Sequence, residues 1–82
     1  MIEIGGRNYQ CVRGSDVDRD GMYLELSDPD SHVLAEIFYS DKTNSMTVTA
    51  YEQNIPLDVL EWFIAAAKTD LLPISESGAA QR

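Results

Sequence analysis

Residues 46–51 have the sequence MTVTAY, and residues 56–71 have the sequence PLDVLEWFIAAAKTDL. The first segment alternates and is rich in β-branched residues, which favours a strand. In the second segment, apolar side chains recur every three or four positions, and Pro56 stands where a helix begins. The chain is therefore predicted to change from strand to helix after Tyr51. The helix is predicted to end before Pro73, because proline would interrupt it.

Strand patterns also occupy most of the chain before this change. They fall at residues 2–4, 8–12, 22–27 and 33–40. Residues that favour turns (glycine, aspartate, asparagine, serine and proline) separate them at 5–6, 14–21, 27–31 and 41–45. This order predicts an α+β domain, with a four- to five-stranded antiparallel sheet in a meander and one C-terminal helix packed on one face. We expect a single domain over residues 1–73 and a flexible C-terminal tail over residues 74–82.

A single helix can cover only one face of such a sheet. Its apolar stripe is expected to include Val59, Leu60, Phe63 and Ile64. The strand residues that alternate toward it are Met22, Leu24, Leu26, Ile37, Met46 and Val48. The other face of the sheet would then be open to water or to a partner.

The composition argues against several classes of protein. With 82 residues and a mass of 9.1 kDa, the chain has the size of one small domain. A net charge of -8 and a pI near 4.2 argue against a nucleic-acid partner, which requires a basic surface. The lone Cys11 excludes an internal disulfide and fits a reducing, cytoplasmic location. No apolar run approaches the ~20 residues of a membrane helix and no leader pattern opens the chain, so no membrane association is expected.

The acidic residues are concentrated in the middle of the sequence. Eight of the fourteen lie between positions 16 and 41, where only Arg19 opposes them. One interpretation is that this charge keeps a small domain soluble. The other is that it forms a surface that attracts and docks a basic protein partner.

Aromatic side chains are interleaved with these acids on the strands. Tyr23, Phe38 and Tyr51 alternate away from the expected core, and Trp62 flanks the apolar stripe of the helix. Exposed aromatic residues beside carboxylates are typical of protein interfaces. The candidate partner-binding residues are therefore Tyr23, Glu25, Glu36, Phe38, Tyr51 and Trp62. In the alternative interpretation, Trp62 covers the edge of the core and the tyrosines pair across strands, or two open sheet faces join in a homodimer.

The sequence offers one candidate metal site and no catalytic one. Asp16, Asp18 and Asp20 precede Gly21 in the D-x-D-x-D-G pattern that opens a calcium-binding EF-hand loop. Ser27 stands where that loop requires a bidentate glutamate, so the alternative is a solvated turn between two strands. His32 is expected on the surface of a turn and nothing pairs it with a nucleophile, so the chain is not expected to be an enzyme or to need a cofactor.

Residues 39–51 and 55–64 resemble segments of small acidic bacterial proteins in which a sheet precedes a helix, and their layout is similar to that of immunity proteins. The resemblance implies a bacterial, cytoplasmic protein and transfers no functional residue. Together with the charge pattern, it suggests a non-enzymatic interaction module, in its most concrete form an inhibitor that binds a basic toxin. The alternatives are a weak calcium-binding domain and a structural subunit that self-associates.

Overall fold

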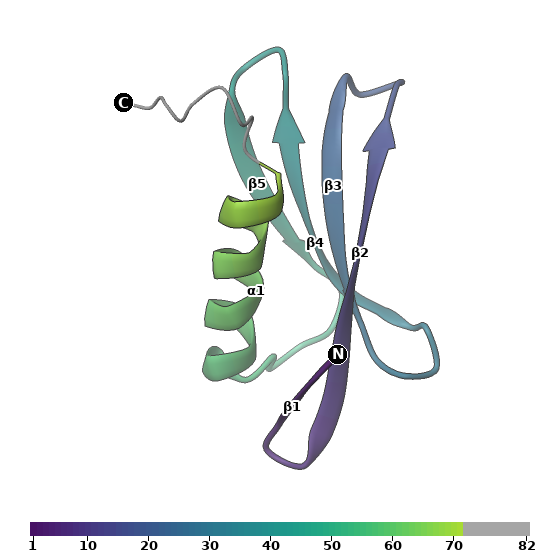
Figure 1. The fold of residues 1–82 in the computed structure, drawn as a ribbon, viewed down its shortest axis with the longest axis vertical. Coiled ribbons are helices and arrows are strands. Elements are labelled where there is room, and N and C mark those ends of the chain that lie inside the picture. The colour runs from purple at the N-terminus through teal and green to yellow at the C-terminus, as the bar shows by residue number, and fades with distance from the viewer. Residues whose placement is uncertain (72–82) are drawn as a thin grey trace.

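The structure is a computed structural model that describes residues 1–71. Five strands precede one helix (Figure 1). The elements are β1 (Ile2–Ile4), β2 (Arg7–Asp16), β3 (Gly21–Ser27), β4 (Val33–Ser40), β5 (Ser45–Ala50) and α1 (Leu57–Asp70). The strands form one antiparallel sheet in the order β1-β2-β3-β4-β5. The predicted α+β class and antiparallel meander are confirmed, whereas the predicted tail at 74–82 lies outside the described residues.

The first hairpin forms as its sequence predicts. Ile4 pairs with Arg7, so the loop between β1 and β2 has only two residues, Gly5 and Gly6. Their φ angles are +64° and +81°, which glycine adopts without the steric cost that a Cβ atom would bring. A two-residue loop with positive φ at both positions matches the twist of the two strands that it joins.

The second strand is longer than the sequence predicts. A turn was expected from Gly14 onward, but β2 continues to Asp16 and pairs with β3 as far as Gly21. The expectation of a turn at residues 14–16 is therefore wrong. The glycine has a different role, since a Cβ atom at position 14 would overlap the ring of Tyr23, which lies across the strand there. The turn itself covers only the four residues 17–20.

The register of the strands separates their side chains into two faces. Directly paired residues of neighbouring strands share a face. On the face toward the helix lie two rows: Arg13, Leu24, Ile37, Val48, and Ser15, Met22, Tyr39, Met46. The opposite face, called the open face below, has the rows Val12, Glu25, Glu36, Thr49, and Gly14, Tyr23, Phe38, Thr47.

The helix and the strands contribute to a single core. The helix buries Val59, Phe63 and Ala67, which lie at i, i+4 and i+8 on one side of it. The buried apolar residues of the chain are Tyr9, Leu24, Leu26, Leu34, Ala35, Ile37, Tyr39, Val59, Phe63, Ala67 and Leu71. Leu60, Ile64, Met22 and Met46 are partly buried against them, as expected. The expectation is wrong for Val48, which is 50% exposed, because its strand lies at the edge of the sheet.

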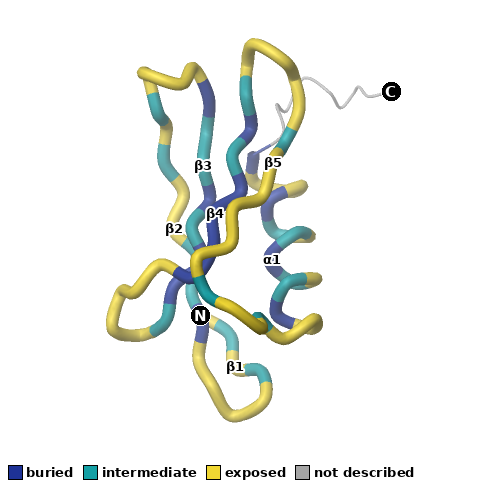
Figure 2. The backbone as a smooth tube through the Cα atoms, turned by 180° about the vertical axis from the view of Figure 1, so that it is seen from behind, coloured by how far each residue is buried: buried dark blue, intermediate teal, exposed yellow. Residues whose placement is uncertain are grey.

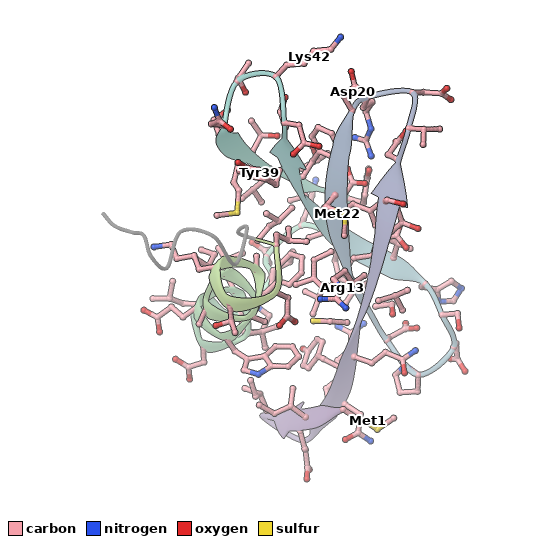
Figure 3. All side chains as sticks on the ribbon, turned by 45° about the horizontal axis from the view of Figure 1, so that its top comes forward. Met1, Arg13, Asp20, Met22, Tyr39 and Lys42 are labelled. Carbon is pink, nitrogen blue, oxygen red and sulfur yellow. The ribbon has the colours of Figure 1, made fainter. Side chains whose placement is uncertain are left out.

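A hydrogen bond at the C-terminal end of the helix connects it to the strands. Arg13 on β2 donates a hydrogen bond to the carbonyl oxygen of Asp70 (3.4 Å), at the last residue of α1. Figures 1 and 3 show the helix running beside the sheet. A groove of about 190 Å³ lies between α1 and strands β4 and β5. Its lining consists of Ile37, Met46, Val48, Ile64, Ala67 and Lys68.

Candidate functional site

Arg19 is the central residue of the open face. It lies in the turn between β2 and β3, and its side chain contacts residues of both β2 and β4. Its Nε donates to Asp16 Oδ2 at 2.6 Å, and its Nη2 and Nη1 donate to the two carboxylate oxygens of Glu36 at 2.9 and 3.2 Å. The guanidinium carbon also lies 4.1 Å from the centre of the Phe38 ring, a cation–π contact. One side chain thus ties the turn to the middle of the sheet.

The charges at this contact change the pKa values of its members. The hydrogen bond from Arg19 is the main reason why the pKa of Asp16 lies below its usual value. The two carboxylates in turn raise the pKa of Arg19. Glu36 is only 9% exposed, and it lies directly opposite Glu25 of β3. Without Arg19, a nearly buried carboxylate would face a second carboxylate across the strand pair, which is unfavourable.

Two aromatic rings lie across glycines on this face. A Cβ atom at Gly14 would overlap the Tyr23 ring, and one at Gly21 would overlap both the Phe38 ring and the backbone oxygen of Tyr39. Both rings are half-buried as a result. Each aromatic side chain therefore lies over the neighbouring strand, and Arg19 contacts Phe38.

The structure brings together four of the six predicted partner-binding residues. Tyr23, Glu25, Glu36 and Phe38 are neighbours on the open face. Tyr51 lies just beyond β5, where its N–H donates to the carbonyl of Leu34 and its side chain is 61% exposed. Trp62 lies on the helix and packs, half-buried, against the core. Sequence reasoning counted Arg19 only as a charge; its position as the one base among eight acids was the signal that could have identified its role.

Two hairpin tips extend the acidic character of the open face. The turn between β2 and β3 and the turn between β4 and β5 are joined where Asp41 N–H donates to the carbonyl of Asp20 (2.9 Å). Lys42 approaches the carboxylate of Asp20 to 3.7 Å, and Figure 3 shows both residues at the tips. Asp16, Asp20 and Asp41 line a hollow of about 190 Å³ between the tips. We call the open face together with these tips the acidic surface. Its charged residues are Asp16, Asp18, Arg19, Asp20, Glu25, Glu36, Asp41 and Lys42.

The remaining acids of the central segment lie at the opposite end of the sheet. Because neighbouring strands run in opposite directions, the turn between β3 and β4, with Asp28 and Asp30, is at the far end from the turn that contains Asp20. The eight acids that are close in sequence are thus divided, six on the acidic surface and two elsewhere.

The carboxylate of the first predicted calcium ligand is already engaged within the chain. Asp16 Oδ1 accepts the backbone N–H groups of Asp18 (3.1 Å) and Arg19 (3.2 Å), and its Oδ2 accepts Arg19 Nε. Among residues 1–71, the oxygens of Asp16, Asp18 and Asp20 do not form a group of three within 4.8 Å of one another. Calcium binding at this turn stays a prediction, which a calorimetric titration with calcium tests.

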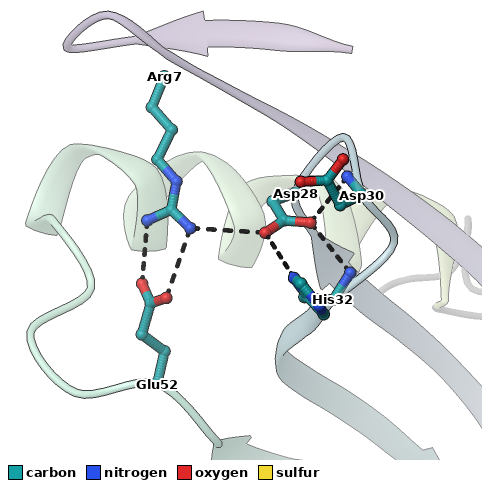
Figure 4. Close-up of polar contacts among 5 residues, drawn as sticks. All are labelled: Arg7, Asp28, Asp30, His32 and Glu52. Carbon is teal, nitrogen blue, oxygen red and sulfur yellow. Dashed lines mark hydrogen bonds and ion pairs between the residues drawn. The ribbon is translucent and has the colours of Figure 1, made fainter.

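A second polar cluster joins three distant segments (Figure 4). Arg7 at the start of β2 donates two hydrogen bonds to Glu52, at 3.2 and 3.4 Å, and lies 3.8 Å from Asp28. Asp28 Oδ1 accepts the backbone N–H groups of Asp30 and His32, and its Oδ2 lies 3.2 Å from His32 Nδ1. The backbone hydrogen bond from His32 is the main cause that lowers the pKa of Asp28.

This cluster also contains the one group of potential metal ligands found within residues 1–71. Atoms of Asp28, Asp30 and His32 lie within 4.8 Å of one another, and sequence reasoning did not pair these residues. The His32 side chain is 75% exposed, in agreement with its predicted place on the surface. Because Asp28 already accepts hydrogen bonds that shape the turn, the cluster is explained by its structural role.

Other residues with potential chemistry are isolated. Cys11 is half-buried on β2, and burial raises the pKa of its thiol to about 11, with a smaller contribution from Asp70. A thiol with such a pKa is protonated at neutral pH and is a poor nucleophile.

Within the described part of the chain, no helix is both long and apolar enough to cross a bilayer.

Comparison with protein-family models, with curated proteins and with solved structures finds no match to this chain.

Proposed function

We propose that this chain is a non-enzymatic interaction module whose acidic surface docks a basic region of a protein partner. One observation carries the proposal. Six of the fourteen acidic residues gather on the open face and the adjoining hairpin tips, with only two basic residues among them. A surface of one sign attracts and orients a partner of the opposite sign before the two touch.

The contacts of Arg19 support this proposal because they are an example, within the chain, of a guanidinium group bound on the open face. A guanidinium is held there between two carboxylates and over an aromatic ring. Glu25 lies beside this site, and its side chain makes no hydrogen bond or ion pair with another residue of the range 1–71. A lysine or arginine of a partner would find a free carboxylate at Glu25 and an aromatic ring at Tyr23 two residues away on the same face.

An inhibitor that covers a basic toxin, as immunity proteins do, is the most concrete form of this role. It requires neither a cofactor nor a catalytic group. It agrees with the absence of an activated nucleophile at Cys11, whose raised pKa is described above.

The test compares two charge reversals in the full-length protein. Glu25→Lys changes the open face, whereas Glu61→Lys makes the same change at an exposed position on the helix. Each protein is immobilised and exposed to a lysate of the source organism, and retained proteins are identified by mass spectrometry. We expect a basic protein to bind the wild type and Glu61→Lys but not Glu25→Lys.

The association rate of the captured protein should also fall as the salt concentration rises from 10 to 150 mM, because the Debye length shortens from about 30 to about 8 Å over that range. Equal capture by both variants, or an association rate that ignores salt, would contradict the proposal.

A further inference from the structure

The β5 strand differs from every other strand of the sheet. It is the only one of the five without a charged residue, and all but one of its six residues are exposed. Figure 2 shows it as an almost unbroken exposed strip. It also ends the sheet order, so that no strand among residues 1–71 pairs with its outer side. Edge strands are usually protected by charges, proline or bulges, and β5 has none of these.

Two hydrogen bonds at the ends of β4 determine which backbone groups of β5 point outward. Tyr51 N–H donates to the carbonyl of Leu34, and Asp41 N–H donates to the carbonyl of Asp20. In an antiparallel ladder, successive residues direct their N–H and C=O groups alternately to the two neighbours. Both bonds give the same result for β5. Thr47 and Thr49 pair with β4, and the groups of Met46, Val48 and Ala50 face outward.

This pattern is self-complementary. If two copies of β5 pair in antiparallel fashion about a twofold axis at Val48, then Val48 lies opposite its own copy and Met46 lies opposite Ala50. These are the residues with free N–H and C=O groups, so every one of them gains a partner. On the open face, the same register places Thr47 opposite Thr49 of the second copy, twice, and cross-strand threonine pairs are favourable.

The self-complementary register and the lack of charge on β5 favour a second copy of this chain as the occupant. Each molecule carries a net charge of -8, so two copies repel one another wherever their acidic surfaces meet. The other four strands contain Glu3, Asp16, Glu25 and Glu36. Among the five strands, β5 is the one through which two copies can pair without bringing carboxylates of the paired strands together.

We propose that two copies of this protein form a twofold-symmetric dimer by pairing their β5 strands, which joins the two sheets into one. The pairing would cover Val48, which is 50% exposed in the single chain, and would close the side of the groove that Met46, Val48 and Ile64 line. Because the twofold pairing uses the β5 edge of both copies, and the edge at the other end of the sheet begins with β1, which contains Glu3, association through β5 ends at two chains. The acidic surfaces remain accessible, so this dimer is independent of the function proposed above.

The first test is the mass of the full-length protein in sedimentation equilibrium, combined with amide hydrogen exchange by NMR. We expect the mass to rise from 9.1 kDa toward twice that value with increasing concentration. The amides of Met46, Val48 and Ala50 should then become protected, while those of Thr47 and Thr49 are protected at every concentration. A mass of one chain at millimolar concentration would overturn the proposal.

The second test uses the register itself. In Thr47→Lys/Thr49→Lys, lysines face one another across the dimer twice, whereas in Thr47→Glu/Thr49→Lys each glutamate faces a lysine. We expect the first variant to weaken the dimer about tenfold or more and the second to restore it, since like charges directly opposite are unfavourable. Both variants change only exposed positions, so folding is preserved.

The same substitution at two valine positions provides the matched control. Val48→Lys should weaken the dimer about tenfold or more, whereas Val17→Lys, at a hairpin position that is 83% exposed, should leave it unchanged. A dimer that resists Val48→Lys but is lost with Glu25→Lys would overturn the proposal, because the copies would then meet through their open faces.

Discussion

On one side of the sheet, a helix of 14 residues inserts Val59, Phe63 and Ala67 into the core; on the other side, a single arginine side chain bridges the turn and the middle of the sheet. The helix contributes apolar side chains, which stabilise the fold through the apolar area that they bury. The arginine acts through charge-assisted hydrogen bonds at a partly exposed position, where water and salt weaken the interaction. The helix side should therefore dominate the stability of the domain, and the open face should remain free to exchange its contacts.

The largest effect is expected on the helix side. Phe63→Ala removes a fully buried ring and should lower the free energy of unfolding by about 3–5 kcal/mol, which is a large part of the stability of a domain of this size. Leu57→Ala on the same helix is the control, because Leu57 is exposed and should change stability by less than about 0.5 kcal/mol. Urea unfolding followed by tryptophan fluorescence measures both. Similar losses in the two variants would show that the helix does not cover the core as described.

A smaller loss is expected where backbone and rings meet on the open face. Gly21→Ala would place a methyl group against the backbone oxygen of Tyr39, which cannot move aside, and should cost about 1–3 kcal/mol. In Gly14→Ala the methyl group meets only the ring of Tyr23, a side chain that can rotate away. Thermal unfolding should therefore show a larger decrease in Tm for Gly21→Ala. The reverse order would mean that the open face is packed as rigidly as the helix side.

The features that follow from local pattern were predictable from the sequence. The Gly5-Gly6 hairpin and the helix stripe have short-range signals, and both form. Features that depend on contacts between distant residues were not. Gly14 is a turn residue by composition, but in the fold its missing side chain makes room for Tyr23 of the next strand.

Arg19 and Glu36 illustrate the same limit at the candidate site. They are 17 residues apart, and only the register of β3 and β4 brings Glu36 opposite Glu25 and within reach of the guanidinium. The division of the acids between two ends of the sheet also follows from strand direction. The sum of charge in a segment was visible in the sequence, whereas the shape of the charged surface was not.

Loss of the contacts from Arg19 to Asp16 and Glu36 should have a smaller effect on stability, and this effect should depend on pH. Arg19→Met should destabilise the domain less than Phe63→Ala, but more than Lys42→Met, whose ion pair is exposed. The pKa of Asp16 is lowered in the folded protein, mainly by Arg19. The contribution of the ionised Asp16 carboxylate to stability is therefore complete above its ordinary pKa of 3.8. This contribution is lost as the pH falls through the lower pKa of the folded state.

In Arg19→Met the part of this contribution that comes from the Arg19 side chain is absent at every pH, so the difference in stability from the wild type should be largest at neutral pH and should shrink below pH 3.8. Urea unfolding at several pH values measures the difference. A gap that stays constant down to the acid limit would mean that the bridge to Asp16 does not contribute to stability.

The smallest expected effect is on the reactivity of Cys11, which measures how well the face toward the helix excludes water. Cys11 pairs with Leu26 on the face toward the helix, and burial is the main reason why its pKa rises to about 11 from an ordinary value of 9.0. The thiol should therefore react slowly with a thiolate-selective reagent at pH 8, and its rate should rise with pH well beyond the range in which an exposed cysteine has levelled off. Unfolding in urea should restore the ordinary rate. Rapid reaction in the folded protein would show that water reaches this face beside the helix, and the contrast between the two sides of the sheet would then be smaller than the core contacts indicate.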